Sequence, residues 1–107
     1  MTIVICHVIH YNSRMIKTFV NKLTEEVFCT GQSKQLPADV LKRAVRKLDM
    51  IDAAVTVEDL RRPPGNRLHV LQGDRFGQYS IAINDQYRIC FKFVGEDAYS
   101  VEICDYH

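Results

Sequence analysis

The sequence lacks a long apolar run and a strong net charge. Its longest apolar stretch, residues 3–9, is interrupted by His7 and is far too short to cross a membrane. No signal-peptide pattern, repeat, linker or low-complexity segment occurs in the 107 residues. The formal net charge of +1 does not by itself favour a nucleic-acid partner, and the 47% hydrophobic content suffices for a single core. We therefore expect one cytoplasmic domain with no membrane attachment.

The cysteines also lack a pattern, because none of the spacings between them is that of a zinc site or a disulfide framework. The four are Cys6, Cys29, Cys90 and Cys104. The sequence predicts that they are reduced thiols packed as small apolar groups. Cys6, His7 and His10 lie close together in the chain but have no second pair of ligands to complete a zinc site. We expect neither a metal nor a cofactor.

The C-terminal part of the chain has the pattern of an antiparallel meander. Four β-type runs, at residues 68–72, 78–83, 87–94 and 98–105, are separated by turn signals. Apolar and polar residues alternate in the last three runs, which predicts one core face and one polar face. In the last run, Tyr99, Val101 and Ile103 are expected on the core face. We call the polar face the platform; it carries Ser80, Ala82, Arg88, Cys90, Lys92, Ser100, Glu102, Cys104 and Tyr106.

The turns predict how these strands pair. A three-residue loop at 84–86 pairs Ala82 with Arg88, and a three-residue loop at 95–97 pairs Phe93 with Tyr99. The second pairing also sets Cys104 opposite Arg88. Tyr106 then becomes the diagonal neighbour of Arg88, within reach of a long side chain.

Two helices are predicted before the meander. The first starts after Asn21, stops at Gly31, and has Leu23, Val27 and Phe28 on one side. The second begins at Pro37, a favourable first helical position. Its apolar stripe consists of Val40, Leu41, Ala44, Val45, Leu48 and Ile51. One further helical turn is expected at 56–59, which has a capping pattern, before two prolines end all helix.

The order of elements predicts an α+β fold. A strand at residues 15–19 comes first, the two helices follow, and both pack on one face of the antiparallel meander. We assign residues 15–107 to the functional domain. Residues 1–14 are predicted to be an N-terminal extension, either an accessory strand or the product of an upstream start.

The polar residues of the platform suit the cleavage of RNA without a metal. Such cleavage needs a base for the 2′-hydroxyl, an acid for the leaving oxygen, and cations that hold the charged phosphorane. Histidine is the residue type suited to the first two tasks, here at His69 and His107, and the guanidinium of Arg88 matches a phosphate. The residues alone leave other interpretations open, since Arg88 could pair with Glu102 and chain ends are often frayed.

Four stretches in this order resemble the HigB toxins of the RelE/ParE superfamily of bacterial toxin–antitoxin modules. They are LRRPPGNRL at 60–68, LQGDRFGQYSI at 71–81, NDQYRICF at 84–91 and VEICDYH at 101–107. The resemblance covers residues 15–107. It implies a RelE-like, microbial-RNase-like fold and a ribosome-dependent endoribonuclease that cuts mRNA in the A site. It also implies a HigA-type helix-turn-helix antitoxin, which neutralises the toxin and carries the contact with operator DNA.

The resemblance further implies which residues act. The catalytic positions fall on His69, Arg88, Asp105, Tyr106 and His107. The expected RNA-binding positions are Arg67, Gln72, Arg75 and Lys92, together with Lys42, Arg43, Arg46 and Lys47 on the outer side of the second helix, which would face ribosomal RNA. Gln72 stands where some relatives have a lysine, so one cation that would face the phosphate is missing.

Two other functions are compatible with the same fold. One is a ParE-like protein that binds gyrase and cleaves nothing, and the other is a non-catalytic member that works only in the antitoxin–operator complex. The set of His69, Arg88, Tyr106 and His107 favours catalysis, because a protein that only binds has no need of it.

Overall fold

The sheet of this protein contains strands from both ends of the chain. The computed structural model describes residues 2–3 and 16–106. Within them, six strands form one sheet in the order β1-β2-β6-β5-β4-β3. Their bounds are β1 Thr2–Ile3, β2 Thr18–Phe19, β3 His69–Val70, β4 Tyr79–Ala82, β5 Tyr87–Val94 and β6 Asp97–Asp105. Strand β2 runs parallel to β6, whereas the other neighbours are antiparallel.

Helix α1 (Lys22–Thr30) has the limits that its sequence predicts. The side chain of Asn21 caps the helix by accepting a hydrogen bond from Thr24 N at 3.0 Å, and Gly31 ends it with a φ of 70°. Thr24 also joins the helix to the sheet. Its buried Oγ1 donates to Asn21 Oδ1 at 2.8 Å and accepts from Ile103 N of β6 at 3.0 Å.

Helix α2 (Ala38–Ala53) forms most of the second layer. Pro37 is predicted to be the first helical residue. It lies instead at the N-cap, with a ψ of 149°, and the helix begins at Ala38. The helix buries Val40, Ala44, Leu48 and Ile51, which share one face because of their helical spacing. Three short 3-10 turns follow: η1 Val57–Leu60, η2 Pro64–Asn66 and η3 Gly73–Arg75. The first has the predicted capping box, formed by Thr56 and Asp59.

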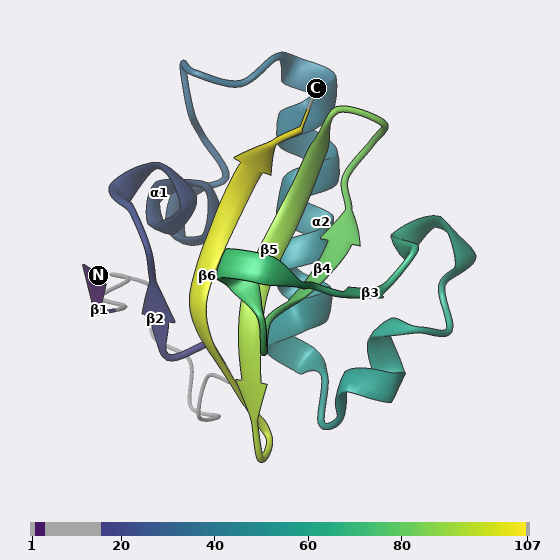
Figure 1. The fold of residues 1–107 in the computed structure, drawn as a ribbon. Helices are drawn as coiled ribbons and strands as arrows, with labels where there is room; N and C mark the ends of the chain where they lie inside the picture. The colour runs from purple at the N-terminus through teal and green to yellow at the C-terminus, as the bar shows by residue number, and fades with distance from the viewer. Residues whose placement is uncertain (1, 4–15, 107) are drawn as a thin grey trace.

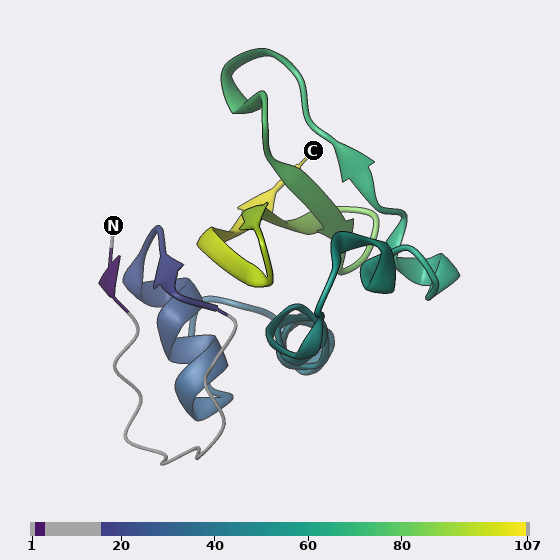
Figure 2. The same cartoon turned by 90° about the horizontal axis from the view of Figure 1, so that it is seen from below.

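The helices and the β3–β4 loop lie on opposite faces of the sheet. Helix α2 packs beneath β5 and β6, with α1 beside it, and the β3–β4 loop rises from the other face (Figures 1 and 2). Phe91 of β5 is fully buried and contacts the rings of Tyr79 and Phe93. The α+β class is therefore confirmed. Neither helix of the described residues is both long and apolar enough to cross a membrane.

The predicted register is right for the first hairpin and wrong at the tip of the second. Ala82 pairs with Arg88 as expected, but β5 and β6 are joined by a two-residue turn that pairs Phe93 with Ala98. Gly95, with a φ of 63°, provides the backbone that a tight turn requires. Ala98, and not Tyr99, is therefore buried in the core.

A bulge in β6 restores the predicted pairing closer to the platform. The register shifts between Cys90 and Lys92, opposite Ser100, whose φ is 54°. The extra residue compensates for the shorter turn. Arg88 therefore faces Cys104 as predicted.

The N-terminal predictions are met only in part. Thr2 and Ile3 pair with Phe19 and Thr18, so β1 extends the sheet beyond β2. The division into residues 1–14 and 15–107 stays a prediction, because residues 4–15 lie outside the described residues. So do Cys6, His7 and His10.

The prediction of reduced cysteines holds for two of the four. Cys90 and Cys104 are free thiols. Cys29 is disulfide-bonded, which makes the prediction wrong at that position. Spacing along the chain could not show this, because it does not report which parts of the chain meet in space.

Candidate active site

The platform is built on a row of paired residues across four strands. His69 faces Ser80, Ser80 faces Cys90, and Cys90 faces Glu102. Side chains at paired positions project from the same face of a sheet, here the face opposite α2. Ser80 and Cys90 are nonetheless fully buried. Longer side chains around this row must therefore cover them.

Arg88 is one of these longer side chains. Its Nε donates to Ser80 Oγ at 2.9 Å, and one terminal nitrogen donates to the carbonyl oxygen of Arg67 at 2.8 Å. Burial and the nearby charge of Arg67 lower the pKa of Arg88, although an arginine with a lowered pKa stays charged at neutral pH. Two contacts thus fix the direction of a guanidinium on the platform, and Glu102 is not its partner.

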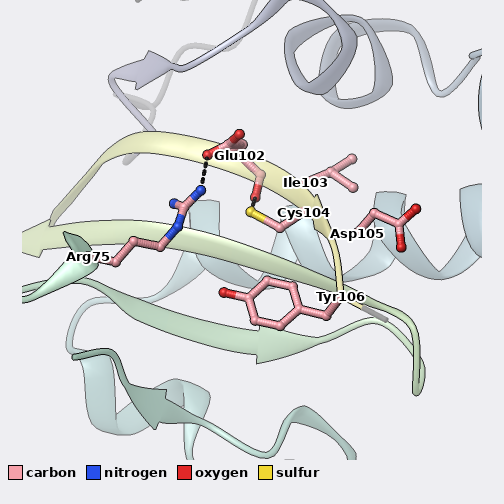
Figure 3. Close-up of a pocket in the computed structure, with 6 residues that line it drawn as sticks. All are labelled: Arg75, Glu102, Ile103, Cys104, Asp105 and Tyr106. Atoms are coloured by element: carbon pink, nitrogen blue, oxygen red, sulfur yellow. Dashed lines mark hydrogen bonds and ion pairs between the residues drawn. The ribbon is translucent and has the colours of Figure 1, made fainter. Parts of the chain in front are cut away.

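Arg75 reaches the platform from the β3–β4 loop. One terminal nitrogen donates to Glu102 Oε1 at 3.0 Å, and the other donates to Gln78 Oε1 at 3.2 Å. Burial alone would lower the pKa of Arg75, but the hydrogen bond to Glu102, followed by attraction to negative charge on the nearby cysteine sulfurs and on Glu102, raises it overall. The loop therefore places a second oriented cation above β6 (Figure 3).

Tyr106 closes the other side of the site. Its backbone N–H donates to Gln86 O at 2.6 Å, and its hydroxyl lies 3.6 Å from Cys90 Sγ. The ring points toward Arg75 (Figure 3). The contact with Cys90, together with burial, raises the pKa of Tyr106 to about 12. The phenol is therefore protonated at neutral pH. In this state Tyr106 can donate a hydrogen bond but cannot act as a general base.

An open depression of about 500 Å³ lies between Arg75 and Tyr106. Its wall is completed by Glu102, Ile103, Cys104 and Asp105 of β6 (Figure 3). The guanidinium of Arg75 at one edge and the phenol of Tyr106 at the other are donors that suit an RNA phosphate. Within the described residues, no cluster of three or more histidine, cysteine or acidic side chains could hold a metal.

The structure does not gather every predicted catalytic residue at one point. His69 is exposed on the edge strand β3, in the same row as Ser80. Asp105 accepts a hydrogen bond from Gln86 Nε2 at 3.1 Å, and its carboxylate points away from the ring of Tyr106 (Figure 3). His107 lies outside the described residues.

The predicted RNA-binding residues are spread over several surfaces. Arg67 is exposed and forms an ion pair of 3.3 Å with Asp85. Gln72 is exposed at the start of η3, and Lys92 is exposed on β5, where it pairs with Tyr99. Only Arg75 of this group lines the depression.

The basic side of α2 contains three exposed cations and a fourth that differs. Lys42, Arg43 and Arg46 are exposed, as expected of an outer face. Lys47 instead donates to Oδ1 of the fully buried Asn66, whose Nδ2 donates to Leu60 O at 3.0 Å. Burial, followed by the charges of Arg46 and Arg43, lowers the pKa of Lys47. Lys47 therefore links α2 to the loop at η2 and is not part of the exposed basic surface that the other three form.

Sequence reasoning missed one exposed aromatic residue beside the site. Phe76 follows Arg75 directly, and 77% of its surface is accessible. Gly73 and Gly77 flank the pair with positive φ angles, and backbone bonds within the loop hold its shape. An aromatic residue next to an arginine between two glycines was the available signal.

A comparison with solved structures shows the class of fold. A chain of the YoeB-YefM complex from Staphylococcus aureus superposes with a TM-score of 0.51 and 19% identity, covering 86% of this chain and 94% of that one. The two chains share an α+β fold.

Sequence comparisons then show the family. A family model described as a RelE-like toxin of the type II toxin–antitoxin system HigB matches residues 17–107. The chain therefore belongs to the RelE-like HigB toxins of type II toxin–antitoxin systems, as its motifs predict. It is 38% identical over 93 residues to a Proteus vulgaris protein named Endoribonuclease HigB, covering 87% of this chain and all of that one. It is also 38% identical over 81 residues to Toxin HigB-1 of Vibrio cholerae, covering 75% and 85%.

Proposed function

We propose that the platform is the active site of an endoribonuclease that cuts mRNA in the ribosomal A site. The observation that carries this proposal is the fixed position of Arg88, which Ser80 and the carbonyl of Arg67 hold on the polar face. Arg75 and Tyr106 border the depression on the same face. The name of the Proteus vulgaris relative, Endoribonuclease HigB, supports the endoribonuclease part of this proposal.

The proposed reaction is attack by the 2′-hydroxyl of the RNA on its adjacent phosphate. Arg88 and Arg75 would stabilise the charge that grows on the phosphorane, since oriented donors gain most where charge develops. Tyr106 would donate a hydrogen bond, because its raised pKa keeps the hydroxyl protonated. Proton transfer to and from the RNA is assigned to His69 and His107, in either order. Asp105 is assigned the positioning of the C-terminal segment through Gln86.

The proposed partners follow from this activity and from the family. A HigA-type helix-turn-helix antitoxin would neutralise the toxin and carry the contact with operator DNA. The ribosome would present mRNA to the platform in the cytoplasm. Lys42, Arg43 and Arg46 form an exposed basic surface that suits ribosomal RNA.

The experiment compares three targets with the purified chain: programmed ribosomes, bare mRNA and gyrase. Primer extension should map cuts within the A-site codon on ribosomes and little cutting of bare mRNA. The 5′ fragment should end in a 2′,3′-cyclic phosphate, the product of attack by the 2′-hydroxyl. Inhibition of gyrase without any cut would instead establish the ParE-like alternative.

Reversing the charge of Lys42, Arg43 and Arg46 to glutamate is expected to weaken ribosome binding. Each lost phosphate contact should lower the slope of log affinity against log salt by about 0.7–0.9. The three side chains are exposed, so the melting temperature should stay within a few degrees. Binding measured across a salt series checks this, with reversal of the exposed Lys22 and Lys34 as the matched control. Equal salt slopes for both variants would show that the α2 surface makes no phosphate contact.

Phe76→Ala is expected to weaken binding of a short single-stranded RNA by about 1–3 kcal/mol. Aromatic side chains next to phosphate-binding cations commonly stack on nucleobases, and that stacking has this magnitude. Phe76→Trp should retain binding. Filter binding with a 2′-deoxy substitution at the cut site measures affinity without cleavage. Val94→Ala is the matched control, because Val94 is 64% exposed at the far hairpin. Equal losses in both variants, or loss of antitoxin binding alone, would contradict the assignment.

A further inference from the structure

Two free thiols lie in contact on the platform, and the proposed reaction uses neither. Cys90 Sγ and Cys104 Sγ are 3.2 Å apart. Cys104 faces Arg88, whereas Cys90 faces Glu102, so the two cysteines are diagonal neighbours on β5 and β6. Tyr106 covers them, with its hydroxyl 3.6 Å from Cys90 Sγ.

The surroundings of the pair suit thiol chemistry. Cys104 Sγ donates toward Cys90 Sγ, and this contact, against an opposing effect of burial, lowers the pKa of the Cys90 thiol below its ordinary value. Arg75 adds positive charge nearby. A thiolate beside a second thiol is the arrangement found in redox-active pairs. Cys104 lines the open depression, which gives a small oxidant a route to the Cys104 sulfur, whereas Cys90 is buried behind it.

We propose that Cys90 and Cys104 form a reversible disulfide that switches the site off, with a hydroperoxide as the oxidant. One thiolate of the pair attacks the peroxide, the O–O bond breaks, and a sulfenic acid forms as water or an alcohol leaves. The second thiol, losing its proton, attacks that sulfur; the S–S bond forms and water leaves. Two thiols thus give up two electrons, and the peroxide is reduced.

The disulfide would act through Tyr106, an effect that rests on the proposed function. A disulfide requires sulfurs about 2.05 Å apart, so the pair must close by more than 1 Å from its present separation. This movement, together with loss of the thiolate, removes the contact with Cys90 Sγ that positions the Tyr106 hydroxyl beside the depression. A bond between diagonal neighbours is strained, and strain makes a disulfide easier to reduce. The oxidised form should therefore return readily to the dithiol.

The test treats the full chain with hydrogen peroxide, alkylates the remaining thiols, and digests it with trypsin. Cleavage after Arg88 and Lys92 separates the two cysteines, so oxidation should yield residues 89–92 linked to residues 93–107. Cleavage of ribosome-bound mRNA should fall about tenfold, as for the loss of one hydrogen bond, and should recover with dithiothreitol. Cys104→Ser should fold, and peroxide should leave its rate of cleavage, compared with that of the same variant untreated, unchanged; Cys104→Ala replaces it if melting shows that serine disturbs the strand.

The outcomes separate this inference from the proposed function. Absence of the linked peptide would overturn the redox pair, whatever the cleavage assay gives. A linked peptide with unchanged cleavage would overturn the switch. Failure of the fully reduced chain to cut mRNA would contradict the proposed nuclease and the switch that rests on it, whereas the linked peptide would still establish the redox pair.

Discussion

Replacing Arg88 with alanine is expected to slow cleavage of ribosome-bound mRNA by about 10²–10³-fold, as removal of one oriented electrostatic contact commonly does. The side chain lies on the platform, away from the core, so the sheet should stay folded. Its bond to the buried Ser80 hydroxyl is lost, however, at a cost of about 1 kcal/mol or 4–8 °C in melting temperature. Single-turnover cleavage and thermal melts of each variant measure the two effects separately.

Two further variants make this prediction sharper. Arg88→Lys keeps the charge but lacks the planar guanidinium, whose separate nitrogens reach Ser80 and the carbonyl of Arg67 and leave donors for a phosphate, so it should recover little activity. Arg61→Ala is the matched control, because Arg61 forms an exposed ion pair with Glu58. Near-normal cleavage by Arg88→Ala would remove Arg88 from the site. Lost cleavage with a collapsed melting temperature would assign it a structural role.

Thr24→Val is expected to give the largest loss of stability among single substitutions of nearly equal volume. Valine fills the same space but leaves Ile103 N–H without the acceptor that Thr24 Oγ1 provides. An unpaired buried donor costs about 1–3 kcal/mol. For a domain of this size that corresponds to roughly 4–8 °C in melting temperature per kcal/mol. Chemical denaturation checks the free energy of unfolding.

The matched control for this substitution is Thr30→Val in the same helix. Thr30 is exposed, and its hydroxyl donates to Glu26 O, a contact that water can replace. Its loss should change stability by no more than about 0.5 kcal/mol. Equal effects of the two substitutions would show that the link from α1 to β6 adds nothing beyond helix propensity.

What could be predicted from the sequence depended on how far apart in the chain the interacting residues lie. Local signals located α1 through Asn21 and Gly31, and alternation located the strands, because both depend on neighbours in the chain. The turn at Gly95 was assigned one residue too many, since alternation alone does not count the residues in a turn. Because the bulge offsets this error, the predicted opposition of Arg88 and Cys104 is right.

The contacts that define the candidate site depend on long-range geometry and were largely outside such reasoning. The pairing of Arg75 with Glu102 spans 27 residues, and that of Lys47 with Asn66 spans 19. Residue type placed Arg75 and Lys47 in one group of RNA-binding cations. Only the folded chain shows that Arg75 reaches the platform, whereas Lys47 is used to hold a loop.

The β5–β6 hairpin pairs in one register near its tip and in another near its base. The two-residue turn at Gly95 advances the pairing by one, and the bulge near Ser100 sets it back. Residues between the turn and the bulge therefore pair one position out of the register that holds for Arg88 and Cys104. The far end of the hairpin can therefore change in length together with the bulge while the site keeps its register.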